Sequence, residues 1–399
     1  MQATRKALFI THEGFSSSIF RSQVIEHCES MLEHGILFEI LTYETFKKSR
    51  AASVSNFGDY VKWGRVPITL KNAINIYLPG STLINCFILA KDLLRLSRSG
   101  NYEFIHARAD YTAFLCAILR PFHKLPVVWD CRGDAVDELK FSIEKYSWFA
   151  RKILGTLLVP RQRFIRYAAA RFSIRSICVS RVLRRLANST NPALRSFEIP
   201  CPVPTNRFYF NPEKRLAARQ RFQISGDEIL FIYSGSMTGY QAIDQFIWYY
   251  KKILSLPNTR VLVATIDKVA ASRLLDDIKS DRLIITSVKY DDMNELYCAA
   301  DFAIMMRAPR PLNQVASPTK FGEYCLTGLP VIHNSSIDQV TQFTRELGNG
   351  LSLEVWPPER IGNDQRFQIA QHSKKFYGRE NLNTIYIECY NGLQKVSSF

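Results

Sequence analysis

A lysine and a glutamate, Lys320 and Glu323, stand three residues apart in a short helical pattern. Ser317 is a good N-cap because its hydroxyl can accept from a free amide, and Pro318 suits the first helical position, which needs no N–H. The unpaired amides and partial positive charge of a helix N-terminus attract phosphate. Lys320 opposes that dipole, and an anion between them would relieve the conflict. A carboxylate such as Glu323 cannot neutralise phosphate, but it can accept from two sugar hydroxyls.

The residues around this helix favour a ligand site. Arg307 follows the apolar run 302–306, and open α/β sheets bind ligands at the carboxyl ends of their strands. Gly328 can take the left-handed conformation that ends the helix, and Val331 begins the next buried strand. Phosphate-binding groups beside a hydroxyl-binding carboxylate predict a nucleotide with its ribose. The alternative is an ordinary surface helix that carries a Lys–Glu pair.

Residues 317–332, Ser-Pro-Thr-Lys-Phe-Gly-Glu-Tyr-Cys-Leu-Thr-Gly-Leu-Pro-Val-Ile, resemble the donor-binding signature of glycosyltransferase family 4. The resemblance implies the GT-B fold, in which two Rossmann-like domains face each other across a cleft. It also implies that Glu323 holds the donor ribose and that Lys320 lies close to the diphosphate. Family members often carry a second acid that contacts the donor sugar, and this chain departs from them by having Val315 at that position. The implied donor-binding residues of this segment are Ser317, Pro318, Thr319, Lys320 and Glu323.

The first half of the chain alternates strand and helix patterns, which is typical of a doubly wound sheet. A helix is predicted over 20–33, and strands are predicted at 7–10, 37–42, 74–77, 104–106, 127–129 and 177–179. Gly14 lies in the first strand–helix loop, where similar enzymes bring backbone close to the donor. No Gly-x-Gly-x-x-Gly follows the first strand, so no dinucleotide cofactor is expected.

Three charged residues follow strands of this first half. Relatives often have two histidines at the spacing of His106 and Arg108, so Arg108 is a candidate catalytic residue that supplies charge to phosphates or binds an anionic sugar. His106 itself fits a buried core histidine better than a ligand. Arg132 and Asp134, in a segment that resembles the family's Asp-x-Arg-Gly, are predicted to position the acceptor. A structural Arg–Asp pair explains them equally well.

The second half predicts another α/β domain. A buried strand at 229–233 leads into a glycine loop in which Gly235 and Ser236 are expected to bring amides to a phosphate. Relatives carry Arg and Lys soon after this glycine, but this chain has neither before Lys251. Arg307 and Lys320 are therefore expected to supply the catalytic positive charge. Further elements are predicted at 261–265, 283–286, 293–300 and 381–396, the last of which crosses back to the first domain.

Length and composition fit this organisation. A chain of 399 residues exceeds the size of most single cores, and its 47% hydrophobic content suffices for two. We expect an acceptor domain over 1–200 with the helix 381–399, and a donor-nucleotide domain over 205–380. Nine scattered cysteines without a Cys-x-x-Cys, and no signal-peptide pattern, predict a cytoplasmic protein with free thiols. No metal site is expected, since no Asp-x-Asp triplet occurs.

Positive charge is concentrated in the first half. Residues 1–200 carry 29 Lys and Arg against 16 Asp and Glu, while residues 201–399 carry 23 against 20. The segment 144–185 holds eleven basic residues and one acid, interleaved with bulky apolar side chains. Such a mixture suits an anionic membrane surface, at the inner face of which a lipid-linked acceptor is delivered, or a polyanion. A solvated helix pair is the alternative.

These observations predict a retaining glycosyltransferase. It would move a sugar from a nucleotide sugar to a glycan or lipid-linked acceptor, in surface polysaccharide synthesis, without a metal or another cofactor. A nucleotide-sugar epimerase of the same architecture is one competing interpretation, and a non-enzymatic polyanion-binding protein is another. Nucleic acid is a disfavoured partner because the sequence has no recognisable nucleic-acid module.

Overall fold

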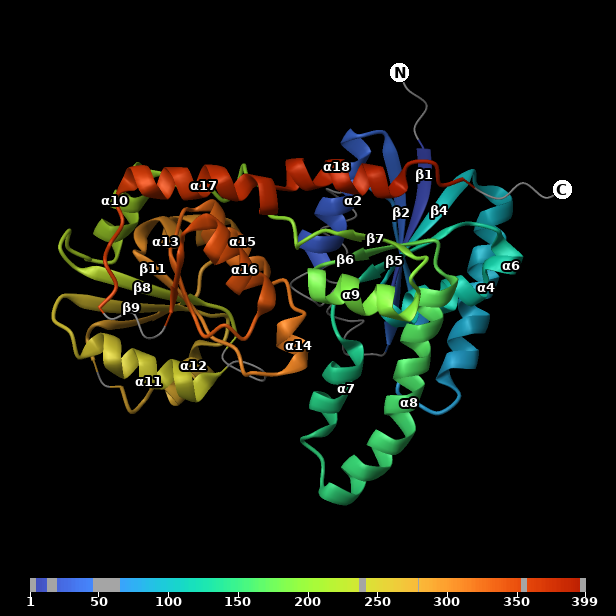
Figure 1. Cartoon of the computed structure of the whole chain (residues 1–399), viewed down its shortest axis with the longest axis horizontal. Coiled ribbons are helices and arrows are strands. Elements are labelled where there is room, and N and C mark those ends of the chain that lie inside the picture. The colour runs from blue at the N-terminus through green and yellow to red at the C-terminus, as the bar shows by residue number, and fades with distance from the viewer. Residues whose placement is uncertain are drawn as a thin grey trace. The chain divides into compact units, whose positions relative to one another are not determined.

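The computed structural model describes residues 5–12, 20–45, 65–236, 242–278, 280–352 and 357–394 of the chain. Internal contacts divide the chain into two compact units, residues 1–199 with 383–399 and residues 200–382. In each unit, helices cover a parallel sheet (Figure 1). The predicted α/β class with two Rossmann-like sheets is confirmed.

The sheet of the first unit contains seven described strands in the order β3-β2-β1-β4-β5-β6-β7. β1 and β5 are buried almost throughout, as expected for strands covered on both faces. The strands are β1 (Arg5–Thr11), β2 (Ile36–Thr45), β3 (Ile68–Ala73), β4 (Tyr102–Arg108), β5 (Val127–Cys131), β6 (Arg175–Cys178) and β7 (Arg195–Glu198).

The strand predicted at 74–77 is wrong, because the third strand of this sheet ends at Ala73. The Asn85 side chain accepts from the Ile74 amide and donates to the Ile74 carbonyl, both at 2.8 Å. The Asn75 carboxamide accepts from the Tyr77 amide at 3.0 Å. Side chains thus take the backbone groups that a further strand would have used, and the segment turns.

The helices of the first unit confirm the prediction for 20–33, which forms a π-helical turn followed by α2. Among the later helices, Asp134 caps α7 and the Ser180 hydroxyl caps α9. The elements are η1 (Arg21–Ile25), α2 (Glu26–Glu33), α4 (Ser81–Ser99), α5 (Ala109–Ile118), α6 (Arg120–His123), α7 (Ala135–Ile143), α8 (Trp148–Phe172) and α9 (Arg181–Thr190).

The last helix, α18 (Arg379–Tyr390), packs on the first unit. The Tyr390 ring stacks on Phe104 at 4.9 Å, and its hydroxyl lies 2.8 Å from His106 Nδ1. Asn383 donates to the Ser30 hydroxyl at 2.7 Å. The C-terminal helix therefore closes the core of the N-terminal unit.

The second unit has a sheet of six described strands in the order β10-β9-β8-β11-β12-β13. Its strands are β8 (Ile229–Ser234), β9 (Thr259–Ala264), β10 (Leu283–Thr286), β11 (Phe302–Met305), β12 (Val331–His333) and β13 (Gly350–Ser352). Its helices are α10 (Pro212–Arg221), α11 (Ile243–Leu254), α12 (Lys268–Leu274), η2 (Tyr290–Asp292), α13 (Met293–Ala299), α14 (Pro311–Gln314), α15 (Thr319–Leu326), α16 (Asp338–Leu347) and α17 (Asn363–Tyr377).

Strand order reverses direction at one point in each sheet, between β1 and β4 and between β8 and β11. In a doubly wound sheet the chain leaves such neighbouring strands toward opposite faces. A crevice therefore opens at their carboxyl ends, and ligands bind there. The fold thus assigns one candidate ligand edge to each unit.

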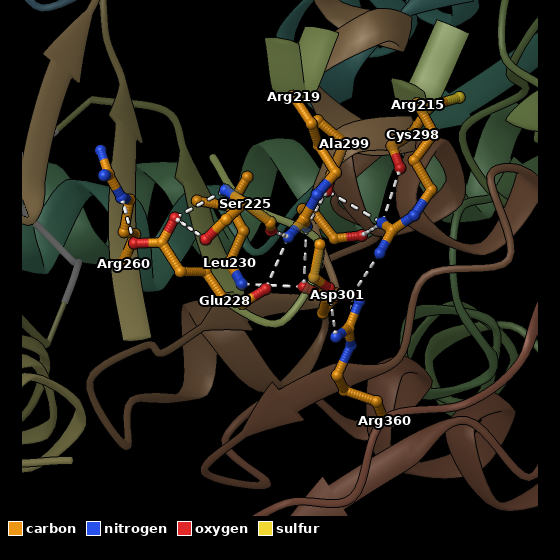
Figure 2. Close-up of polar contacts among 12 residues, drawn as sticks. Arg215, Arg219, Ser225, Glu228, Leu230, Arg260, Cys298, Ala299, Asp301 and Arg360 are labelled. Atoms are coloured by element: carbon orange, nitrogen blue, oxygen red, sulfur yellow. Dashed lines mark hydrogen bonds and ion pairs between the residues drawn. The ribbon is translucent and has the colours of Figure 1, made fainter. Parts of the chain in front are cut away.

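The amino edge of the second sheet is built around Asp301 (Figure 2). Arg215 and Arg360 bond its Oδ1 at 2.6 and 3.1 Å, while Arg219 and the Leu230 amide bond its Oδ2 at 3.2 and 2.8 Å. Arg215 and Arg219 also donate to backbone carbonyls at residues 298–300, the buried C-terminal end of α13. This Asp301 cluster ties α10, α13 and β8 to the start of β11.

Two helices of the first unit project past its sheet. In Figure 1, α7 and the first half of α8 extend together below the strands as an arm. Pro160 lies inside α8, between this projecting half and the half that packs on α5. Among the described residues, no helix combines the length and the apolar character needed to cross a bilayer.

Candidate functional site

The site in the second unit starts at α15, which begins one residue later than predicted. Pro318 is extended, with ψ of 120°, so it occupies the N-cap and not the first turn. The Ser317 hydroxyl accepts from the Cys201 amide at 3.0 Å and caps nothing, which corrects the predicted cap. The predicted C-terminal end is confirmed: Gly328 has φ of +63° and the Leu329 amide bonds the Tyr324 carbonyl.

Glu323 is a buried carboxylate with one oxygen engaged. Its side chain is only 1% exposed. Lys320 Nζ lies 3.0 Å from Oε2, and the Tyr297 hydroxyl donates to the same oxygen at 2.8 Å. No hydrogen bond or ion pair from the described residues reaches Oε1. A buried carboxylate normally satisfies both oxygens, so Oε1 has acceptor capacity for a ligand.

A hydrogen-bond chain connects Glu323 to the end of β8. The Tyr297 hydroxyl lies 2.8 Å from the Ser234 hydroxyl, which lies 2.9 Å from the Tyr324 hydroxyl. Burial, and next the charge of Glu323, raise the pKa of Tyr297 well above its ordinary value. Tyr297 therefore stays protonated and donates to Glu323. Ser234 is the last residue of β8, so these hydrogen bonds hold Glu323 at the switch point of the sheet.

Lys320 retains capacity to bind an anion. Its ammonium lies 5.5 Å from the centre of the Tyr290 ring and 5.9 Å from that of Tyr297, and its side chain is 32% exposed. An ammonium has three N–H donors, and the bond to Glu323 uses one. The predicted Lys–Glu pair exists, but Glu323 lies inside the protein, which an ordinary solvated surface pair would not require.

The remaining predicted donor residues lie at the same carboxyl edge. Gly235 directly follows β8 and has φ of +147°, which side chains disfavour. The Tyr233 hydroxyl donates to the carbonyl of the exposed Ser236 at 2.5 Å. Asn334 holds the backbone of Arg307 by accepting from its amide and donating to its carbonyl. Gly14 lies outside the described residues.

The carboxyl edge of the first sheet carries a buried cluster around Asp130. Its Oδ2 lies 3.1 Å from His106 Nε2, 2.9 Å from Arg132 Nε and 3.5 Å from an Arg108 nitrogen. Burial disfavours the charged carboxylate, but Arg132 and the other neighbours outweigh it and hold the pKa of Asp130 well below its usual range. Arg108 is 1% exposed and also donates to Gln23 at 2.6 Å. His106 is buried, as predicted for a core histidine.

Arg132 and Asp134 belong to different clusters and do not pair with each other. Asp134 accepts from the Val136 and Asp137 amides at 3.1 Å, and from Arg166 at 2.6 Å. Arg166 also lies 3.2 Å from Asp110. Asp134 thus starts α7 and attaches it to α8, whereas Arg132 is ion-paired with Asp130.

Sequence reasoning missed the groups that hold these residues in place. Tyr297 and Ser234 carry no motif, and they come from an α-helix and a strand 63 residues apart. Asp130 is the first residue of the segment that resembles Asp-x-Arg-Gly, and this position in the motif could have identified it. No sequence signal identified Gln23, because a glutamine in an amphipathic helix is usually a surface residue.

The fold is similar to that of known glycosyltransferases. Sucrose-phosphate synthase from Thermosynechococcus elongatus matches with TM-score 0.69 and 13% identity, over 98% of this chain and 99% of that one. HepE from Anabaena, in complex with UDP and glucose, matches with TM-score 0.65 and 14% identity, over 98% and 100%. A Rickettsia africae glycosyltransferase matches with TM-score 0.66 and 13% identity, over 99% and 100%. No protein-family model and no curated protein matches the sequence.

These likenesses extend over almost the whole length of both chains in each pair. The chain therefore has the two-domain GT-B fold of glycosyltransferases. At this level of identity the comparisons establish the fold alone, and the membership of family 4 stays a prediction.

Proposed function

We propose that this protein transfers a sugar from a nucleoside-diphosphate sugar to a glycan or lipid-linked acceptor, in the synthesis of a surface polysaccharide. The observation that carries the proposal is the buried Glu323 carboxylate at the switch point of the second sheet, with Oε1 uncommitted. The similarity to HepE, which has been crystallised with UDP-glucose, supports a nucleotide sugar as the donor.

In this proposal the second unit binds the nucleotide. Glu323 Oε1 accepts from the ribose hydroxyls, and Tyr297 and Lys320 hold the carboxylate in place through Oε2. The two remaining N–H groups of Lys320 face the diphosphate. Ser236 brings its backbone amide to the same phosphates, and Gly235, whose own amide is bonded to the Ala264 carbonyl at 3.0 Å, allows the backbone to turn there. Residues 317–319 border these phosphates.

The reaction breaks the bond between the sugar and the diphosphate, so negative charge accumulates on the leaving oxygen atoms. Fixed cations stabilise that charge because they need no reorganisation during the reaction. Lys320 and Arg307 supply these cations. We propose that the reaction retains the anomeric configuration and that it uses no bound metal or other cofactor.

We assign acceptor binding to the first unit. Arg132 is 10% exposed, and its bond to Asp130 orients the guanidinium at the carboxyl edge of the first sheet. Arg108 is buried and bonded to Gln23 and Asp130, so it acts as a positioning residue for this cluster. Asp134 contributes by fixing the start of α7.

The substitution Glu323→Gln tests the donor site. It keeps the shape of the side chain and an oxygen that accepts from Tyr297, but it removes the charge that pairs with Lys320 and receives the ribose. A hydrogen bond to a charged group contributes about 1.5 to 3 kcal/mol, so UDP affinity in calorimetry should fall by about tenfold or more. Glu228→Gln is the matched control, since Glu228 is ion-paired with Arg260 at the opposite edge of the sheet.

Equal UDP affinity in the wild type and Glu323→Gln would contradict the assignment of Glu323. Circular dichroism must show that Glu323→Gln and the control Glu228→Gln are both folded. If UDP does not bind, a panel of other nucleoside diphosphates in a thermal-shift assay identifies the base, because a ligand of the folded state raises the melting temperature. Release of an altered nucleotide sugar in the absence of any acceptor would indicate the epimerase and overturn the proposed transfer.

A further inference from the structure

The arm of α7 and α8 overhangs the carboxyl edge of the first sheet (Figure 1). α7 starts just beyond the carboxyl end of β5, and α8 returns to end just before β6 begins. α8 has 25 residues and is therefore about 37 Å long, whereas the 5-residue β5 spans about 17 Å. The helix is too long to be covered by the sheet, so its first half extends past the edge where the Asp130 cluster lies.

The overhanging helix exposes apolar side chains that a soluble surface would not need. Phe149, Leu157 and Phe164 are 68%, 66% and 59% exposed, and Ile153 between them is 45% exposed. At 3.6 residues per turn these four fall on one stripe of the helix. Ile165 and Ala169, on another side of the helix, are buried against the unit. The exposed stripe is thus a second apolar side, and a contiguous exposed patch marks an interaction site.

The start of α4 continues this patch. Leu83 and Phe87, one turn apart, are 79% and 73% exposed. Arg161 of α8 donates to the Thr82 hydroxyl at 2.6 Å, which places the start of α4 against the middle of α8. We define the apolar face as seven exposed residues: Leu83 and Phe87 of α4, the stripe Phe149, Ile153, Leu157 and Phe164 of α8, and Trp148 at the start of α8.

Cations surround the apolar face. Lys152 Nζ lies 5.2 Å from the ring of Trp148, and Lys145 Nζ lies 5.3 Å from the ring of Tyr146. Arg163 is exposed beside the stripe, and on α4 the exposed Lys91 follows Phe87 by one turn. An aromatic ring with an ammonium over it has an apolar body and a charged end, the combination that suits the boundary between lipid tails and headgroups.

The combination of groups identifies the occupant. A polyanion such as RNA would pair with the cations but would leave the aliphatic stripe of Ile153 and Leu157 in water. A protein interface of ordinary composition has few lysines in its core. An anionic bilayer accepts the apolar side chains below its headgroups and the cations on its phosphates.

We propose that the apolar face docks on an anionic phospholipid bilayer, with α8 and the start of α4 lying in the headgroup region. Docking brings the carboxyl edge of the first sheet, with Arg132, next to the membrane. If the proposed glycosyl transfer is correct, the acceptor is therefore carried by a lipid of that membrane; the docking itself does not depend on the transfer.

Vesicle co-sedimentation of the full chain tests the docking. We expect binding to vesicles of equal parts phosphatidylcholine and phosphatidylglycerol at low salt, weaker binding as salt rises, and weak binding to phosphatidylcholine alone. The double variant Phe149→Ser/Leu157→Ser should lower the partition coefficient by at least about tenfold, since each side chain contributes on the order of a tenfold factor when buried. Both positions are exposed, so the fold should tolerate the changes.

The chain contains a matched control. Trp148 on α8 and Trp248 on α11 are 66% and 57% exposed, and each has a lysine four residues later over its ring, at 5.2 and 5.4 Å. Trp148→Ser should weaken vesicle binding by several-fold, whereas Trp248→Ser should leave it unchanged. Nucleotide affinity should be the same in both, which separates failure of docking from failure of the proposed transfer.

Four outcomes would overturn the inference. Undiminished vesicle binding by the double variant would exclude the apolar face, and equal binding to neutral vesicles would exclude the role of the cations. No vesicle binding, together with salt-sensitive RNA binding that Lys152→Glu abolishes, would assign the face to a polyanion. Concentration-dependent dimers that the double variant dissociates, again without vesicle binding, would assign it to a second copy of the chain.

Discussion

Two buried carboxylates of the second unit differ in how their oxygens are used. Asp301, at the amino edge of the sheet, has both oxygens bonded, by three arginines and the Leu230 amide (Figure 2). Glu323, at the carboxyl edge, has one lysine and one tyrosine, both on Oε2. Both side chains are at most 5% exposed, so the two carboxylates are equally buried. They differ in whether both of their oxygens have hydrogen-bond partners.

The difference separates stability from binding. The Asp301 cluster leaves no acceptor for a ligand, and its arginines also satisfy backbone carbonyls, so it holds elements together. The Glu323 network supports one oxygen and leaves the other available. We therefore expect changes at Asp301 to lower stability and leave nucleotide affinity unchanged. Changes in the Glu323 network should lower nucleotide affinity and have little effect on stability.

The largest effect should come from Asp301→Asn. It would leave three guanidinium groups, two of them largely buried, without a counter-charge, which typically costs about 3 to 5 kcal/mol. The melting temperature of the second unit in calorimetry should fall by about 10 °C. UDP affinity measured below that transition should not change. A melting temperature within a degree of the wild type would mean that the cluster is not a stabilising centre.

The pH dependence of stability offers an intermediate effect. Burial disfavours the charged form of Asp301, but Arg215 and its other partners outweigh it and hold the pKa of Asp301 below its ordinary value. A depressed pKa contributes stability above the unfolded value of about 3.9, and this contribution disappears as the pH falls through the folded pKa. The melting temperatures of the wild type and Asp301→Asn should therefore converge below about pH 4. A constant gap down to pH 2 would show that the charge of Asp301 is not the source of its effect.

The smallest effect should come from Tyr297→Phe, which removes one donor to Glu323 Oε2 and keeps the ring. A net hydrogen bond contributes about 1 kcal/mol, so UDP affinity should fall by about fivefold, less than in Glu323→Gln, with a small change in melting temperature. Isothermal calorimetry on the two single variants and the double variant measures the coupling. Strictly additive losses would show that Tyr297 does not act through Glu323.

Much of the fold could be predicted from local patterns. The runs at 7–10, 127–129 and 229–233 are short and apolar, and each is a buried strand in the structure. Gly328 was correctly placed as the end of its helix because only a residue that tolerates positive φ closes a helix in this way. The prediction failed where a side chain of the following helix competes for backbone groups, as Asn85 of α4 does at Ile74.

The candidate site was predictable as a segment but not as a network. The spacing of Lys320 and Glu323 places them on one face of a helix, so their contact follows from the sequence. The loss of the Ser317 cap depends on the Cys201 amide, 116 residues away, and no local pattern contains it. For the same reason Arg132 and Asp134, two residues apart, have different partners.

The sequence by itself determined the alternation of strands and helices, the ends of most of them, and the excess of positive charge in residues 144–185, because each depends on neighbours along the chain. Only the tertiary structure decided which carboxylate has partners on both oxygens and which apolar stripe is exposed to solvent. Asp301 and Glu323 are both acids near strands, and their fates differ because one meets three arginines from distant segments and the other meets one tyrosine. α8 is likewise exposed because the sheet beneath it is shorter than the helix.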